Sequence, residues 1–94
     1  MLFVIRGVDA PGKASVRAAH RRDHLEGIRE LGPDVKLAGP LLSDDGVHMV
    51  GSLLVVDFTD RAAAEAFVQK DPYVRAGLFS EISVQPFRVV VGRE

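Results

Sequence analysis

The sequence predicts an α+β protein whose elements follow the order β-α-β-β-α-β. Short runs rich in β-branched and aromatic residues alternate with two segments of helical periodicity, and turn residues separate them. The chain has 94 residues, of which 47% are hydrophobic, so it can build one hydrophobic core. We therefore expect a single domain over residues 1–94.

The first half of the chain contains a strand, a helix and a second strand. Residues 2–8 are β-rich, and the turn signal Asp-Ala-Pro-Gly at residues 9–12 ends them. Residues 14–31 have helical periodicity, and the following Gly-Pro ends this helix because proline cannot continue it. Residues 35–42 fit the next strand.

The longest apolar run, residues 49–58, predicts a central strand. Thr59 or Asp60 can cap the second helix, because either side chain can accept a hydrogen bond from a free backbone N–H. This helix should end near Lys70, since Pro72 disfavours the helical conformation in the residue before it.

The last strand is predicted over residues 82–91, with residues 78–80 in the connection before it. Pro86 interrupts this strand and indicates an edge position or a bulge, because proline cannot donate to the sheet. The complete order is the ferredoxin-like arrangement.

Both faces of the predicted strands are apolar. Phe3 and Ile5 oppose Leu2 and Val4 in the first strand, and Val89 and Val91 oppose Val90 in the last. Two helices cover only one face of such a sheet, and the other would be a larger apolar patch than monomers expose. Packing of two identical sheets covers it, so we expect a homodimer.

Charge and composition exclude several classes of partner. The net charge of −1 and the pI near 6.3 argue against nucleic acid. There is no cysteine, so disulfides and cysteine-bound zinc are excluded. The apolar N-terminus reaches only to Arg6, which is too short for a signal peptide or a membrane span. We expect a cytoplasmic protein that needs no cofactor.

Three polar residues lie on the helix face that should meet the sheet: Arg17, Arg21 and His24. Buried charge is costly without a partner, so these side chains either reach solvent or line a polar cleft. Long side chains keep their charge in water, so we expect Arg17 to be solvated. For Arg21 and His24 both alternatives remain open.

Asp71 follows the predicted end of the second helix and is held by the stiff Pro72. A carboxylate placed in this way is a suitable partner for His24, although Asp-Pro is also an ordinary turn signal. His20 and His24 have a spacing that can chelate a metal, but no third ligand follows in a known pattern, so no metal site is predicted. His48 lies beside a turn and is expected at the surface.

The chain resembles the YCII-related (YciI-like) family. Five short segments carry the resemblance, in order and along nearly the whole chain: Arg21-x-x-His24-Leu25, Gly39-Pro40, Gly51-Ser52, Asp71-Pro72-Tyr73 and Pro86-Phe87. The resemblance implies a dimeric α/β barrel of two ferredoxin-like subunits. It also implies a cleft that holds a His-Asp pair, here His24 and Asp71. A known family member is a dehydrochlorinase of a chlorinated, hydroxylated aromatic ring, and related barrels include muconolactone isomerases.

We therefore predict a small cofactor-free enzyme, a lyase (dehydrochlorinase) or an isomerase, that acts on a small anionic or phenolic compound. His24 would transfer the proton, and Asp71 would fix its tautomer. Arg21, Tyr73 and Ser52 are predicted to bind the substrate: Arg21 by charge and Tyr73 by its hydroxyl. The alternative is a non-catalytic protein, either a small-ligand-binding protein or an accessory to another enzyme, that holds a small ligand in the same cleft.

Overall fold

The computed structural model describes residues 1–93 and confirms the ferredoxin-like α+β fold. The elements are β1 (Leu2–Asp9), α1 (Ala14–Arg29), β2 (Val35–Leu42), β3 (Met49–Asp57), α2 (Arg61–Lys70), α3 (Pro72–Arg75) and β4 (Phe79–Phe87), with a short 3-10 turn η1 (Gly32–Asp34) before β2. The sheet order is β2-β3-β1-β4, and neighbouring strands are antiparallel. No helix within residues 1–93 is long and apolar enough to cross a membrane.

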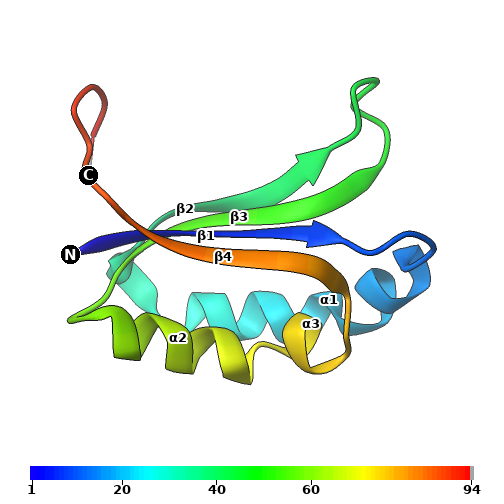
Figure 1. Ribbon diagram of the computed structural model, residues 1–94, viewed down its shortest axis with the longest axis horizontal. Helices are drawn as coiled ribbons and strands as arrows, with labels where there is room; N and C mark the ends of the chain where they lie inside the picture. The colour runs from blue at the N-terminus through cyan, green and yellow to red at the C-terminus, as the bar shows by residue number, and fades with distance from the viewer. Residues whose placement is uncertain (94) are drawn as a thin grey trace.

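All three α-helices lie on one face of the sheet (Figure 1). On the opposite face, which we call the outer face, the β2–β3 hairpin and the segment after β4 both rise away from the sheet. The two-layer arrangement places the core between the sheet and the helices.

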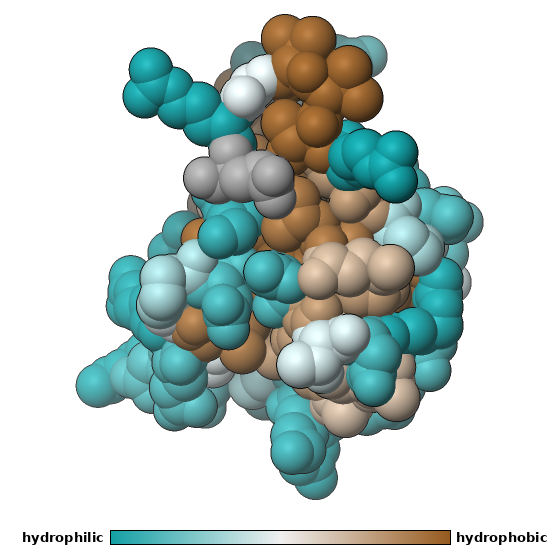
Figure 2. Space-filling model, turned by 90° about the vertical axis from the view of Figure 1, so that its left-hand side faces the viewer, coloured by the Kyte–Doolittle hydropathy of each residue, from teal (hydrophilic) through white to brown (hydrophobic). Residues whose placement is uncertain are grey.

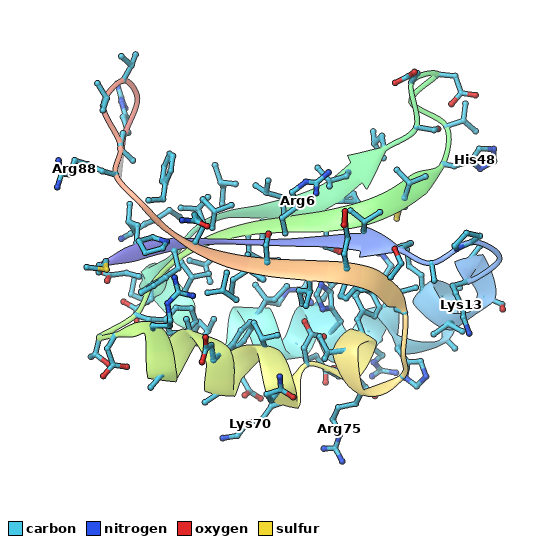
Figure 3. The ribbon with its side chains drawn as sticks, in the orientation of Figure 1. Arg6, Lys13, His48, Lys70, Arg75 and Arg88 are labelled. Carbon is cyan, nitrogen blue, oxygen red and sulfur yellow. The ribbon has the colours of Figure 1, made fainter. Side chains whose placement is uncertain are left out.

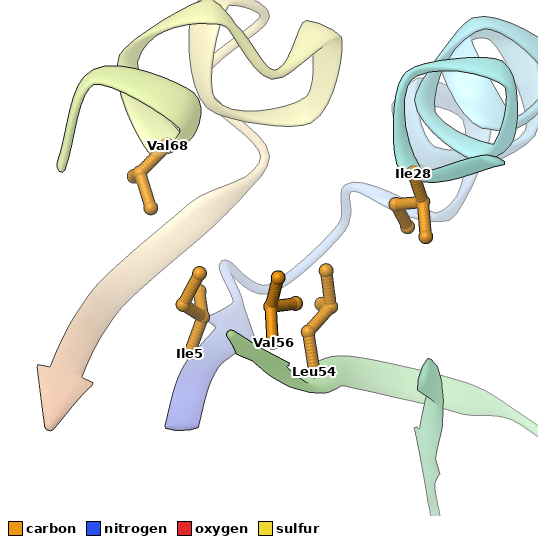
Figure 4. Close-up of a cluster of buried hydrophobic side chains, with 5 residues drawn as sticks. All are labelled: Ile5, Ile28, Leu54, Val56 and Val68. Carbon is orange, nitrogen blue, oxygen red and sulfur yellow. The ribbon is translucent and has the colours of Figure 1, made fainter. Parts of the chain in front are cut away.

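The core forms because alternate strand residues face the helices. Ile5, Leu54 and Val56 project from β1 and β3 toward Ile28 of α1 and Val68 of α2 (Figure 4). Each of these five side chains is at most 6% exposed. The central positions of β1 and β3 in the sheet, which their apolar composition favours, give them neighbours on both sides.

Helix α2 begins as the sequence indicates. The side chain of Asp60, not that of Thr59, caps it by accepting a hydrogen bond of 2.8 Å from the backbone N–H of Ala63. The helix ends at Lys70, before the Asp71-Pro72 pair. The short helix α3 then begins at Pro72, and it was not predicted from the sequence.

The predicted bounds of the last strand were wrong. β4 begins at Phe79 and ends at Phe87, so residues 79 and 80 belong to the strand, not to the connection. The reason lies in its partner: β1 pairs with β4 from Asp9 opposite Phe79 to Leu2 opposite Phe87, and no residue of β1 remains for the chain that follows. The edge position that Pro86 indicated is confirmed.

The outer face is apolar except along part of β4 and at Arg6 of β1. Ser83 and Gln85 of β4 face outward and pair with Arg6 and Val4 of β1, whereas Phe87 at the end of the same row is 44% exposed. Figure 3 shows Arg6 projecting from this face. Leu37 in β2 is 54% exposed, and Figure 2 shows hydrophobic side chains gathered above the sheet at the end that carries both termini.

Candidate functional site

A cavity lies between α1 and the β2–β3 side of the sheet, and we call it the site cavity. It is partly open to solvent, and the space in it for the centres of water-sized molecules is about 50 Å³. The polar side chains that line it come from three elements: Arg17, Arg21 and His24 from α1, Ser52 from β3 and Tyr73 from α3. Its apolar wall includes Pro40 of β2. A space of this size admits a few water molecules or one edge of a small molecule, because roughly 10–15 Å³ by this measure is enough to hold one water.

His24 and Asp71 are in direct contact, although 47 positions separate them in the chain. The Nδ1 atom of His24 lies 2.9 Å from Oδ1 and 3.0 Å from Oδ2 of Asp71. Both side chains are less than one-tenth exposed. Since a carboxylate accepts hydrogen bonds, the contact places the imidazole proton on Nδ1, and Nε2 remains for a ligand.

Asp71 is fixed by the backbone as well as by the histidine. Its Oδ1 accepts a hydrogen bond of 2.9 Å from the backbone N–H of Tyr73, so the residue is the N-cap of α3. The two interpretations of Asp71 are therefore compatible: the residue belongs to a turn and also contacts His24. The cap holds the carboxylate in place for His24, and the catalytic role of the pair stays a prediction.

Tyr73 lies in a stack of three side chains. Its ring is parallel to that of His24, with centroids 3.9 Å apart and an interplanar angle of 16°. On the ring of Tyr73 also lies the guanidinium of Arg17, whose Cζ is 4.7 Å from the centroid. Phe79 meets the same ring edge-on at 6.1 Å. The stack places the buried imidazole and the buried cation on one tyrosine.

Phe79 can approach Tyr73 because residue 7 is a glycine. A Cβ at Gly7 would lie 2.7 Å from the ring of Phe79, closer than carbon atoms approach. The missing side chain in β1 therefore leaves room for the aromatic residue that supports the stack from the sheet side.

The expectation that Arg17 is solvated was wrong. Arg17 is 5% exposed, and its Nε and Nη2 donate hydrogen bonds of 2.7 and 2.8 Å to the two carboxylate oxygens of Asp9. Nη2 also donates to Ser52 Oγ at 3.0 Å. Burial lowers the pKa of Arg17, but the hydrogen bonds and charge of Asp9 raise it by more, so the guanidinium stays charged.

Sequence reasoning missed Asp9, which it placed only in a turn. One signal was available: an arginine on an inward helix face needs a buried acceptor, and Asp9 ends the strand just before that helix. Ser52, predicted as a ligand contact, lines the site cavity and accepts the hydrogen bond from Arg17.

The hydroxyl of Tyr73 is buried without a hydrogen-bond partner among residues 1–93. Burial raises the pKa of Tyr73, and this effect outweighs the lowering by Arg17, through its charge and its nearby N–H groups, and by the charge of Arg21. The phenol is therefore a protonated donor at neutral pH.

The remaining candidates lie outside this buried group. Arg21 lines the site cavity but is exposed. His20 faces a surface groove with Lys70 and Arg75, away from the cavity, and Figure 3 shows the side chains of Lys70 and Arg75 directed away from the sheet. His48 lies on the β2–β3 hairpin (Figure 3). The part of the chain that the structure describes holds no group of three or more side chains that could bind a metal.

Comparison with known proteins adds a family. The model of the YCII-related domain matches residues 1–88. Protein YciI of Escherichia coli O6:H1 is 33% identical over 97 aligned positions, which cover 96% of this chain and 99% of that protein.

Two solved structures resemble the fold to different degrees. The 5-chloro-2-hydroxyhydroquinone dehydrochlorinase TftG of Burkholderia phenoliruptrix AC1100, in complex with 2,5-dihydroxybenzoquinone, matches with a TM-score of 0.86 and 32% identity over 94% of each chain. An antibiotic biosynthesis monooxygenase matches with a TM-score of 0.57 and 17% identity over 97% of this chain and all of that one. At this identity the second match concerns the fold alone.

Proposed function

The chain belongs to the YCII-related family, and we propose that it is a small-molecule enzyme that transfers protons on a hydroxylated, phenol-like compound. The contact between His24 and Asp71 carries this proposal. It supplies an oriented imidazole whose Nε2 is left for a ligand beside a partly open cavity. The similarity to a hydroxyhydroquinone dehydrochlorinase supports the class of compound.

The proposed chemistry begins when Nε2 of His24 accepts a proton from a hydroxyl group or an activated carbon of the ligand. The electron pair of the broken bond stays on the ligand as an enolate or phenolate. In a dehydrochlorination the imidazolium returns this proton to the ring carbon that bears chlorine, which gives a keto tautomer. Loss of a second hydroxyl proton to Nε2 then forms a carbonyl group as the C–Cl bond breaks, so that HCl is lost overall. In an isomerisation the imidazolium returns the proton to another carbon. Asp71 stabilises the imidazolium for as long as His24 carries the extra proton.

The test measures chloride release from 5-chloro-2-hydroxyhydroquinone and loss of other hydroxylated rings by absorbance. We expect turnover by the wild-type protein and a loss of about a hundredfold or more in His24→Asn, since general acid–base catalysis contributes about 10²–10⁴ in rate. His48→Asn is the matched control, because His48 lies on the hairpin away from the helices. Unchanged turnover in His24→Asn would overturn the proposal. Saturable binding without turnover would favour the non-catalytic alternative.

We also propose that the protein is a homodimer that packs outer face on outer face. The exposed Leu37 and the lack of any helix on this face within residues 1–93 support it. Two subunits joined in this way would form the dimeric α/β barrel.

A further inference from the structure

The unpaired hydroxyl of Tyr73 is the strongest unexplained feature of the molecule. Its oxygen is buried and its residue is 0% exposed. Arg17 lies close enough to lower the pKa of this hydroxyl, but no group within residues 1–93 makes a hydrogen bond of good geometry with it. Buried polar groups are nearly always paired, because an unpaired one loses its hydrogen bonds to water and gains none. Tyr73 also lines the site cavity. The hydroxyl has no surface open to water in this structure, so a ligand oxygen would meet it only after a small shift of the side chains in the cavity wall. An unpaired hydroxyl in that position is suited to such a ligand.

Arg17 offers further donors at the same place. Its hydrogen bonds within the described chain all come from Nε and Nη2, so the N–H groups of Nη1 are left over. Asp9 holds the guanidinium by two hydrogen bonds, and the group cannot turn without breaking both. A fixed cation therefore lies on the ring that carries the unpaired hydroxyl.

The chemistry of these groups specifies their ligand. Arginine has only donors, and the phenol of Tyr73 keeps its proton because burial raises its pKa. A pair of donors requires an acceptor, and the positive charge favours an acceptor that is negative. The small volume of the site cavity, about 50 Å³, admits the oxygen-bearing edge of a ring rather than a bulky group. A phenolate or enolate oxygen meets these conditions.

We infer that Arg17 and the hydroxyl of Tyr73 form an oxyanion site, which binds a phenolate or enolate oxygen of the ligand beside His24. This inference rests on the proposed function and assigns the charge-binding role to the buried Arg17 instead of the exposed Arg21. The buried Arg17 attracts an anion more strongly than the exposed Arg21, because water and salt screen an exposed charge. Negative charge that develops when His24 takes a proton would then be stabilised by these two donors.

The experiment titrates the protein with 2,5-dihydroxybenzoquinone, whose enolic hydroxyls ionise, and with 2,5-dimethoxybenzoquinone, which has no ionisable oxygen. We expect Tyr73→Phe to weaken binding of the dihydroxy compound by about ten- to hundredfold, as loss of a hydrogen bond to a charged group does. The dimethoxy compound should bind weakly to both proteins. Absorbance of the bound dihydroxy compound against pH gives a second measurement: wild type should keep it ionised to lower pH than Tyr73→Phe does.

Stability separates a binding role from a structural one. Because the hydroxyl has no partner within residues 1–93, Tyr73→Phe should keep the thermal midpoint of wild type or raise it. Arg17→Lys keeps the charge but loses the planar fork, so it should also weaken binding of the dihydroxy compound. Arg22→Lys is the matched control on the same helix, because the side chain of Arg22 is 90% exposed; it should bind as wild type does.

Two outcomes would overturn the inference: equal affinity of wild type and Tyr73→Phe for the dihydroxy compound, or no saturable binding by wild type. Its failure is distinct from that of the proposed function. Binding that depends on Tyr73 without any turnover would leave the oxyanion site standing and remove the enzyme. Turnover that depends on His24, with no effect of Tyr73→Phe, would support the proposed enzyme and remove the oxyanion site.

Discussion

Replacement of Asp9 by alanine should strongly destabilise the protein. Asp9 accepts two hydrogen bonds, of 2.7 and 2.8 Å, from Arg17. The side chains are 10% and 6% exposed, respectively. In Asp9→Ala the guanidinium remains buried and charged but has lost its counter-charge.

The expected loss in free energy of unfolding is about 3–5 kcal/mol, the range for removing one partner of a buried ion pair. This is a large share of the roughly 5–15 kcal/mol by which such a domain is stable. Asp57 provides the control: it also forms an ion pair of 2.8 Å, with the N-terminal ammonium, but both groups are about half exposed or more. Asp57→Ala should therefore change the stability far less, since exposed pairs contribute little.

Urea unfolding followed by circular dichroism, at one fixed protein concentration, measures these differences. The double variant Asp9→Ala/Arg17→Met removes the charge as well as its partner. It should recover much of the lost stability, because the penalty in the single variant comes from the unpaired cation. The reasoning would be refuted if Asp9→Ala stayed within about 1 kcal/mol of wild type, or if the double variant were less stable than the single one.

Three further predictions concern other parts of the molecule. Tyr73 is the one tyrosine and there is no tryptophan, so ultraviolet absorbance follows its ionisation; since burial raises its pKa above 10.0, its contribution to stability is intact below about pH 10 and falls as the pH rises further. An absorbance titration whose midpoint lies at the ordinary pKa of tyrosine would contradict this prediction. Gly51→Ala should destabilise by about 1–3 kcal/mol, since its Cβ would lie 2.5 Å from the carbonyl oxygen of Gly7; Gly27→Ala in α1, whose Cβ meets nothing within 4 Å, should instead stabilise by up to about 1 kcal/mol, and urea unfolding compares the two. Light scattering should give the mass of a dimer for wild type and of a monomer for Leu37→Glu; a monomeric wild type would remove the proposed barrel.

Local chemistry determined most of the element order. Strand and helix periodicity, the Asp60 cap, the stop before Asp71-Pro72 and the edge position of Pro86 all depend on a few neighbouring residues. These features could be read from the sequence for that reason. His24 and Asp71 could be named as partners from the sequence. Helical periodicity put His24 on the inward face of the first helix, the predicted end of the second helix located Asp71, and the family resemblance implied that the two form a pair.

Only the tertiary structure decided which groups are buried together. The helix pattern put Arg17 on the inward face but could not show that Asp9 would meet it, so solvation was the natural expectation. The true end of β4 depended on where β1 ends. The unpaired hydroxyl of Tyr73 depended on every neighbour around it. The physical reason is common to all three: burial and pairing are set by contacts between different elements, and periodicity along one segment carries no information about its partner's register or side chains.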